Sequence, residues 1–314
     1  MSFDPSAWVW MNGQLLRLGQ ATLNVTSYGL HYGAGVFEGM RSYGTAEGPS
    51  VFRMDAHLER FRASAAVYGM RIPYGTYELA EAVGEVIALN GLTDSYIRPI
   101  CYLGSESLGV RADCPVEVAI IAWASVFHVR PEVRARGARV TVSPWVKFSS
   151  NMMPATAKAC GQYINSRLAL SEASSRGFDE ALVLNADGNI AEGAVENVFI
   201  LSGRTLRTND ERSSILMGIT RDSIIEIARA LGYQVEIGAL TLEDLLRADE
   251  AFFTGTAVEV LPIREVDGQL IGGPSPGPVT RIIQRAYYDA VSGRDPAHKH
   301  WLHLVGRSAY HAVT

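Results

Sequence analysis

Residues 192–199, EGAVENVF, decide the fold together with residues 206–208, LRT, and residues 216–221, LMGITR. In the first stretch, Glu192 stands beside a glycine at a strand start, where the backbone can approach a flat ligand closely. In the last stretch, Gly-Ile-Thr opens a helix, whose free backbone N–H groups and Thr220 hydroxyl form a ready anion site. Together these groups suit a phosphorylated ring that carries a basic nitrogen.

Each of these features also has an ordinary structural interpretation. A threonine that follows glycine at a helix start is usually only a cap, and a Glu-Gly pair is usually a turn. Their joint spacing favours the functional interpretation, because the whole pattern resembles the long and specific signature of the class IV pyridoxal-phosphate-dependent aminotransferases. Met217 stands where proline is common in that family.

The chain has only three lysines, Lys147, Lys158 and Lys299, against twenty-five arginines. A single lysine is normally a solvated surface residue, and we predict this for Lys147 and Lys299. Lys158 lies in residues 154–163, PATAKACGQY, among small uncharged side chains. Desolvation there is expected to lower the pKa of its amine, so that the neutral amine can form a Schiff base.

Residues 154–163 also resemble the family's cofactor-lysine motif, which implies that Lys158 is the catalytic residue and binds pyridoxal 5'-phosphate. The resemblance places the Tyr163 phenol against the 3-oxygen of the ring and the Glu192 carboxylate at the ring nitrogen. Arg53 corresponds to the arginine that grips the phosphate, and residues 253–257, FTGTA, to a loop that serves phosphate and substrate. No metal ligand is implied. The implied cofactor-binding residues are Arg53, Lys158, Tyr163, Glu192, Ile219, Thr220 and Thr256.

Residues 95–99, SYIRP, indicate which member of the family the chain resembles. They are similar to a strand motif of branched-chain amino-acid aminotransferases, in which Arg98 accepts a glutamate side-chain carboxylate and Tyr96 lines an apolar pocket. The alternative is that Arg98 forms a buried structural ion pair. The expected reaction passes the amino group of L-leucine, L-isoleucine or L-valine to 2-oxoglutarate. The expected substrate-binding residues are Tyr32, Phe37, Tyr96, Arg98, Val110, Thr256 and Ala257.

Assembly and fine specificity follow from the same resemblance. Tyr32, within residues 31–39, HYGAGVFEG, and the loop 108–110 reach the neighbouring subunit's site in this family, which implies a homodimer or a larger homo-oligomer. Residues 124–130 depart from the family pattern, with Ser125, Phe127 and His128 in place of an expected tryptophan and tyrosine. Activity on D-amino acids or R-amines, and an aminodeoxychorismate-type lyase reaction, therefore stay open.

Composition and charge exclude several other classes of protein. The net charge of -5 gives no reason to expect nucleic acid or an anionic membrane as a partner, so the expected partners are small molecules. The three cysteines are odd in number and far apart, which argues against disulfides and zinc. The longest apolar stretch, residues 116–127, is interrupted by Glu117 and too short to span a bilayer. With no signal peptide at the start, we expect a cytoplasmic enzyme.

The chain of 314 residues suggests two domains. We expect an N-terminal α/β domain over residues 1–124, an interdomain loop over 125–139 and a cofactor-binding domain over 140–314. Mixed helices and strands in both halves favour an α+β fold. The resemblance implies fold-type IV, with a smaller sandwich-like N-terminal domain and a larger pseudo-barrel C-terminal domain.

Local patterns predict the main elements. Asn12-Gly13 predicts a hairpin between residues 8–11 and 14–18. Asp55 is expected to cap a helix with Leu58, Phe61, Ala65 and Tyr68 on one face and Gly69 as its stop. Further helices are expected at 77–90, 163–176, 220–231 and 279–292, and further strands at 96–103, 116–124, 140–143, 181–184, 189–191 and 198–201.

Overall fold

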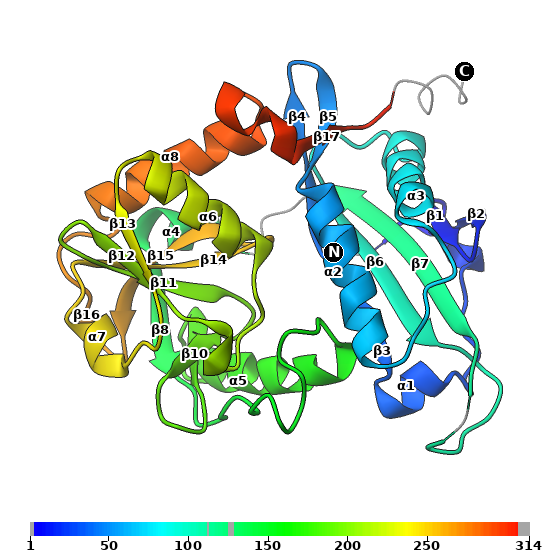
Figure 1. The fold of residues 1–314 in the computed structure, drawn as a ribbon, viewed down its shortest axis with the longest axis horizontal. Coiled ribbons are helices and arrows are strands. Elements are labelled where there is room, and N and C mark those ends of the chain that lie inside the picture. The colour runs from blue at the N-terminus through cyan, green and yellow to red at the C-terminus, as the bar shows by residue number, and fades with distance from the viewer. Residues whose placement is uncertain (1–2, 112, 125–128, 307–314) are drawn as a thin grey trace. The chain divides into compact units, whose positions relative to one another are not determined.

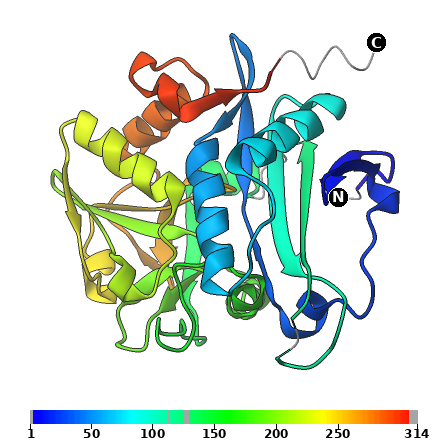
Figure 2. The same ribbon diagram turned by 45° about the vertical axis from the view of Figure 1, so that its right-hand side comes forward.

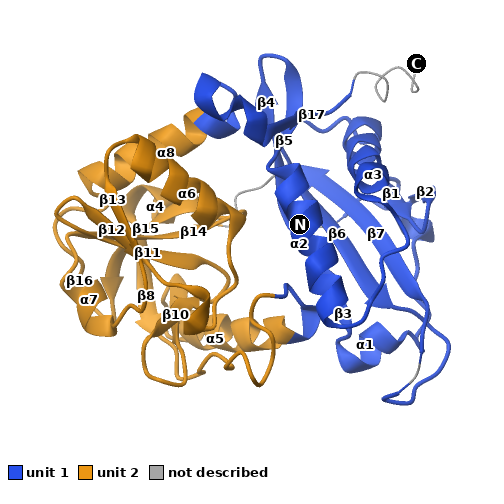
Figure 3. Cartoon of the chain, in the orientation of Figure 1, with its two compact units in different colours: residues 1–126, 157–161, 290–314 blue, residues 127–156, 162–289 orange. Residues whose placement is uncertain are grey.

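The chain passes back and forth between two units, which Figure 3 shows in different colours. The structure is a computed structural model that describes residues 3–111, 113–124 and 129–306. Unit 1 contains residues 1–126, 157–161 and 290–314, and unit 2 contains residues 127–156 and 162–289. The boundaries at 124 and 140 stay a prediction. Residues 125–128 of the expected interdomain loop lie outside the described residues.

Unit 1 contains an eight-stranded sheet whose strand order differs from the order along the chain. The order is β17-β5-β4-β6-β7-β1-β2, with β3 paired to β6 (Figure 1). Its strands are β1 Trp8–Met11, β2 Gln14–Arg17, β3 Gly35–Phe37, β4 Met40–Thr45, β5 Gly48–Phe52, β6 Ser95–Leu103, β7 Val116–Ala124 and β17 Leu302–Leu304. Its helices are α1 Tyr28–Tyr32, α2 Met54–Val67 and α3 Thr76–Leu89.

The predicted hairpin is confirmed at β1 and β2. The two strands are antiparallel, with Met11 opposite Gln14. Asn12 and Gly13 both have positive φ, at 50° and 83°. This backbone is the one that a two-residue hairpin turn requires, and asparagine followed by glycine adopts it readily.

Helix α2 follows the prediction in its core face but not at its ends. Leu58, Phe61 and Ala65 are buried as expected. Asp55 lies in the first turn and does not cap the helix, because Arg53, in a left-handed conformation, is the residue that precedes it. Tyr68 was expected on the buried face but follows the last helical residue, where the chain turns away, and it is 37% exposed.

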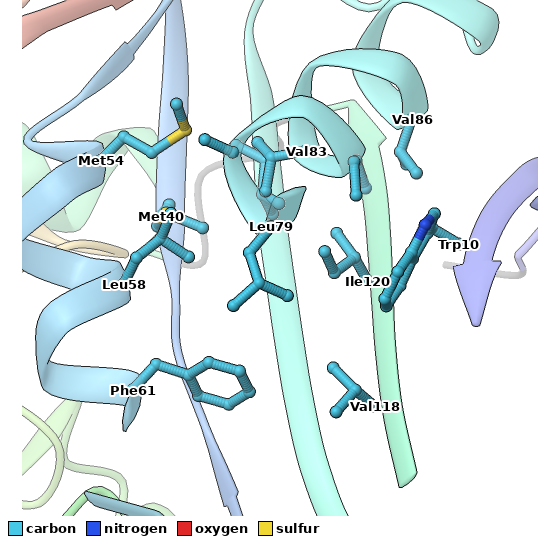
Figure 4. Packing of buried hydrophobic residues seen from close by; sticks show 14 of the residues in the cluster. Trp10, Met40, Met54, Leu58, Phe61, Leu79, Val83, Val86, Val118 and Ile120 are labelled. Atoms are coloured by element: carbon cyan, nitrogen blue, oxygen red, sulfur yellow. The ribbon is translucent and has the colours of Figure 1, made fainter. Parts of the chain in front are cut away.

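The core of unit 1 lies between α2, α3 and one face of the sheet, as Figures 1 and 2 show. Figure 4 shows side chains of the two helices pointing toward one another and toward strands β4 and β7. Burial of such side chains stabilises a fold by roughly 25 cal/mol per Å² of apolar surface. The labelled members of this core are Trp10, Met40, Met54, Leu58, Phe61, Leu79, Val83, Val86, Val118 and Ile120.

Unit 2 contains a nine-stranded mixed sheet in the order β10-β9-β8-β15-β14-β11-β12-β13, with β16 paired to β15. Strand β8 is parallel to both β9 and β15, and β12 is parallel to β13. The strands are β8 Ala138–Val142, β9 Glu180–Leu184, β10 Ile190–Gly193, β11 Asn197–Ser202, β12 Thr205–Thr208, β13 Gln234–Ile237, β14 Glu250–Gly255, β15 Glu259–Val266 and β16 Gln269–Leu270. The helices are α4 Pro131–Arg136, α5 Tyr163–Ser175, α6 Ile219–Ala230, α7 Leu242–Leu246 and α8 Pro278–Val291. Helices and strands mixed in both units confirm the α+β prediction.

The carboxylate of Glu250, on β14, closes the N-terminus of α8. Its Oε1 accepts the Val279 N–H at 3.0 Å, and its Oε2 accepts the N–H of Thr280 at 2.7 Å and the hydroxyl of Thr280 at 2.6 Å. A Cβ at Gly277 would stand 2.1 Å from the Glu250 carboxyl carbon, so glycine is required for this approach. The buried carboxylate thereby satisfies N–H groups that a helix start leaves open.

In the part of the chain that the structure describes, every helix is too short or too polar to traverse a lipid bilayer.

Candidate active site

Lys158 lies in unit 1, on a short segment that two neighbouring elements hold through its backbone. The Phe37 N–H donates to the Lys158 carbonyl oxygen at 3.0 Å, and Ala159 forms a β-bridge with Val36. The Lys158 N–H donates to Ser64 Oγ on α2, at 3.0 Å. Strand β3 and helix α2 therefore fix the base of the lysine side chain.

The surroundings of the Lys158 amine favour its neutral form. Enclosure by the protein and the positive charge of Arg60 lower the pKa of Lys158 to about 8. The amine also lies 5.1 Å from the centroid of the Phe37 ring. This direction agrees with the sequence prediction, although two arginines, Arg60 and Arg98, contribute to the shift along with desolvation.

A buried carboxylate, Glu38, organises the charges beside the lysine. It accepts His57 Nδ1 at 2.7 Å, Arg60 Nε at 2.6 Å and Arg60 Nη2 at 2.9 Å. Burial alone would raise the pKa of Glu38, but Arg60 and His57 outweigh it and hold that pKa well below its usual range. Burial lowers the pKa of His57 despite this contact, which favours a neutral imidazole that donates its Nδ1 proton.

Sequence reasoning missed Arg60 and selected Arg53 at the start of the same helix. The Arg53 guanidinium carbon lies 5.2 Å from the Trp301 ring centroid, and the Arg53 backbone N–H donates to the Trp301 carbonyl at 2.6 Å. Arg60, unlike Arg53, is one of the two arginines whose charge lowers the pKa of Lys158. Its spacing, three residues after His57 on α2, places both side chains on one helix face, and this spacing was the available signal.

Three predicted substrate residues lie together in unit 1. Arg98 Nη2 donates to the Tyr96 hydroxyl at 3.4 Å, and its guanidinium carbon lies 4.5 Å from the Phe37 ring centroid. Phe37 and Tyr96 are buried. Among the described residues, the buried Nε of Arg98 has no hydrogen-bond partner. Both interpretations of Arg98, as a substrate-binding residue and as part of a structural ion pair, stay predictions.

Tyr32 lies with the loop that contains Val110. Its hydroxyl donates to the Leu108 carbonyl at 2.9 Å, and the Tyr28 hydroxyl donates to the Val110 carbonyl at 2.9 Å. The centroids of the two tyrosine rings are 4.5 Å apart. The Tyr32 and Val110 side chains are exposed, Val110 by 77%. The structure thus groups Tyr32 and Val110 as one surface feature of unit 1.

In unit 2, Glu192 is held by a cation and a backbone donor. Lys147 Nζ donates to Glu192 Oε1 at 2.5 Å, and the Leu216 N–H donates to Glu192 Oε2 at 3.1 Å. The prediction that Lys147 is a solvated surface residue is wrong, because its side chain is only 10% exposed. The prediction holds for Lys299, which is mostly exposed and pairs with Glu47.

A β-bulge on strand β10 affects the direction in which the Glu192 side chain leaves the strand. The register shifts between Ile190 and Glu192 on β10, which leaves one extra residue on that strand. The buried Asn209 amide donates to the carbonyls of Ile190 and Ala191, both at 2.6 Å. Asn209 therefore satisfies backbone groups at the bulge and stabilises it.

Asn197 follows the turn after Glu192 (the Glu192 turn, residues 194–196) and connects it to the start of α6. Its amide donates to the Leu216 carbonyl at 2.9 Å. A Cβ at Gly218 would stand 2.0 Å from Asn197 Oδ1, so only glycine fits there. Ile219 and Thr220, the first residues of α6, are buried. The predicted helix start after Gly218 is therefore confirmed, and its use as an anion site stays a prediction.

The other predicted residues of unit 2 lie in turns and at a helix start. Thr256 and Ala257 are half-buried in the turn between β14 and β15. Asn197 pairs with Thr254 across β11 and β14, which brings this turn beside the Glu192 turn. Tyr163 is half-buried at the first position of α5.

The family model described as amino-transferase class IV matches residues 35–266. A branched-chain-amino-acid aminotransferase of Pseudomonas aeruginosa is 43% identical over 303 residues, covering 96% of this chain and 98% of that protein. The protein of that name from Escherichia coli K12 is 39% identical over 309 residues, covering 98% of this chain and 100% of its own.

Solved structures agree with these relatives. The T.th. branched-chain amino acid aminotransferase with pyridoxamine 5'-phosphate matches with a TM-score of 0.93 at 42% identity, covering 96% of this chain and 99% of that one. The same protein complexed with N-(5'-phosphopyridoxyl)-L-glutamate and with 4-methylvaleric acid matches at TM-scores of 0.91 and 43% identity, with the same coverage.

Proposed function

We propose that this chain, which belongs to the class IV aminotransferase family, transfers the amino group of L-leucine, L-isoleucine or L-valine to 2-oxoglutarate. The family model together with the branched-chain relatives of 39–43% identity makes it a pyridoxal-phosphate-dependent branched-chain aminotransferase with the two-domain fold of type IV. The particular donors, the acceptor and the roles of single residues are the proposal.

Several residues have chemistry that suits the cofactor. Lys158 has an amine of lowered pKa, Glu192 has a carboxylate whose side chain is only 7% exposed, and the N-terminus of α6 can receive a phosphate. When bound, pyridoxal phosphate supplies an electron-withdrawing ring that stabilises the charge left on the substrate's α-carbon. The proposed cofactor-binding residues are Arg53, Lys158, Tyr163, Glu192, Ile219, Thr220 and Thr256.

Lys158 and Glu192 have the two chemical roles. With the cofactor bound, the Lys158 amine would hold it and would remove and return the α-proton of the substrate. A pKa of about 8 leaves a useful fraction of this amine neutral near neutral pH. The Glu192 carboxylate keeps the ring nitrogen protonated, so that the ring can withdraw electrons.

The observation that carries the substrate proposal is Arg98, a guanidinium beside two aromatic rings whose buried Nε has no hydrogen-bond partner in the described residues. The rings of Phe37 and Tyr96 offer apolar surface to an aliphatic side chain. Arg98 offers a cation to the second carboxylate of glutamate or 2-oxoglutarate. One site of this kind can accept both substrates of the exchange. The remaining proposed substrate residues are Tyr32, Val110, Thr256 and Ala257.

The visible spectrum of the loaded protein tests this proposal. L-Leucine, D-alanine and R-1-phenylethylamine are added separately, without acceptor, and loss of the absorbance of the lysine-bound cofactor is followed. We expect L-leucine to bleach the band fastest. A faster response to D-alanine or to the amine would keep the family and overturn the substrate assignment. Turnover that needs no 2-oxo acid would instead support a lyase.

A homodimer or larger homo-oligomer and a cytoplasmic location belong to the same proposal. The exposed Tyr32 and Val110 support the assembly, since the family resemblance assigns these residues to a neighbouring subunit's site. Sedimentation of the purified protein tests it, and a monomer at micromolar concentration would contradict it.

A further inference from the structure

The ion pair between Lys147 and Glu192 is nearly buried on both sides, at 10% and 7% exposure. We propose that Lys147 is a positioning residue, which holds the Glu192 carboxylate oriented toward the ring nitrogen of the cofactor. The inference rests on the proposed function, because it concerns the partner of a proposed cofactor-binding residue. In this arrangement Lys147 contacts Glu192 and does not contact the cofactor itself.

The backbone of Lys147 lies close to Glu192, so the lysine side chain can reach the Glu192 carboxylate. The Lys147 N–H donates to the Leu184 carbonyl at 2.8 Å, so the segment before Lys158 runs beside the end of β9. Glu192 pairs with Val183 of the same strand. The ammonium also lies 4.7 Å from the Phe148 ring centroid. The lysine is therefore fixed at its backbone and at its charged end.

The contacts of Glu192 leave room for one more donor. A carboxylate has about four lone-pair positions, and the structure uses one on Oε1 for Lys147 and one on Oε2 for Leu216. A protonated ring nitrogen can occupy one of the others. A buried carboxylate is costly to keep charged without a cationic partner. Lys147 is that partner for Glu192, and its contact with Oε1 fixes the direction of the carboxylate on which the role of Glu192 depends.

A structural role for the pair gives a different expectation from a positioning role. If the pair only stabilises unit 2, its loss weakens every ligand of the site alike. If it positions Glu192 for the ring nitrogen, its loss weakens only ligands that contain this nitrogen. The 1-deaza analogue of pyridoxal phosphate, in which carbon replaces the ring nitrogen, separates the two cases.

The experiment measures the dissociation constants of pyridoxal phosphate and its 1-deaza analogue for the cofactor-free full-length chain. The variants are Lys147→Met, Lys147→Arg and, as a matched lysine control, the exposed Lys299→Met. We expect Lys147→Met to reduce the preference for the nitrogen-containing cofactor by roughly tenfold, the lower end of what lost orienting partners cost at metal sites. Lys147→Arg, which keeps the charge, should retain most of the preference, and Lys299→Met should retain all of it.

Equal weakening of both cofactors in Lys147→Met, or an equally large loss of preference in Lys147→Arg, would overturn the inference. If Lys147→Met does not fold, Lys147→Gln provides the same comparison with a neutral donor. A wild-type chain that gives no borohydride-trapped adduct on Lys158 would refute the proposed function as well. That outcome is distinct, because it is seen before any variant is compared.

Discussion

At the scale of the residue, the environment of Lys158 predicts an unusual reactivity. A lysine whose pKa is lowered to about 8 is half neutral at that pH, whereas an ordinary lysine is almost fully charged there. In the cofactor-free protein, the rate of Lys158 acylation should therefore rise with pH and reach half of its maximum near pH 8. Mass spectrometry of the modified peptides measures this rate. Lys299, in the same digest, controls for the pH dependence of the reagent, and the same profile for both lysines would contradict the prediction.

Arg98 predicts a split between two substrates. Arg98→Met keeps the length and apolar contacts of the side chain but removes the cation beside Tyr96. We expect kcat/KM for L-glutamate to fall by roughly 10- to 100-fold, which corresponds to about 1.5–3 kcal/mol for a hydrogen bond to a charged group. The value for L-leucine should change little. Single-turnover kinetics with each amino acid measure both values, and an equal loss for the two would contradict the assignment.

At the scale of the element, sequence signals succeeded where the determinant is local. Gly69, expected to end a helix, has positive φ, and so do Gly91 and Gly232, which directly follow the helices expected at 77–90 and 220–231. Asn12-Gly13 gave the correct hairpin for the same reason. Local signals did not reveal that a carboxylate on β14 closes the start of α8, because Glu250 and Thr280 are distant in sequence and meet only in the folded unit.

The cap on α8 gives a prediction about stability. Glu250→Ala removes three hydrogen bonds from the first turn of the helix. We expect it to lower the free energy of unfolding by about 1–3 kcal/mol, since buried donors lose their acceptor. Denaturation by urea, followed by fluorescence, measures the change. Glu243→Ala, which removes an exposed pair with Arg247, is the control and should change stability by less than about 0.5 kcal/mol. Similar changes in both variants would argue against the cap.

At the scale of the whole molecule, Glu38 connects stability to pH. Its pKa is held well below the usual range, because Arg60 and His57 outweigh the effect of burial. A group with a depressed pKa in the folded state stabilises the protein above its unfolded value and loses this contribution as the pH falls. Glu38→Gln should therefore lower the melting temperature at pH 7, at a cost of about 3 kcal/mol for the broken buried pair. In this variant the melting temperature should also fall less steeply as the pH drops below the ordinary pKa of a glutamate, about 4.3.

Thermal unfolding between acid and neutral pH measures this difference. Glu47→Gln, at the exposed pair with Lys299, is the control and should follow the wild-type profile. A parallel profile for Glu38→Gln, shifted equally at all pH values, would contradict the linkage.

The candidate site was predictable from the sequence only in part, because contacts between residues that are distant in sequence form only on folding. Lys158 and Glu192 stand in specific sequence patterns, and the resemblance to a family identified both. Lys147 was misinterpreted and Arg60 was missed, because their ion-pair partners, Glu192 and Glu38, are distant in sequence and come near only on folding. The division into units was equally hidden. Residues 157–161 join unit 1 through contacts with β3 and α2, and no change of composition marks that passage.

The scarcity and placement of the lysines have a practical consequence for chemical conjugation. Lys147 is covered by its pair with Glu192, and Lys158 lies within the candidate site, whereas the Lys299 side chain is 58% exposed. Lysine-directed dyes, tethers or solid supports would therefore attach to the folded, cofactor-loaded protein mainly at Lys299. The chain accordingly offers a single lysine handle for oriented immobilisation, without any engineered residue.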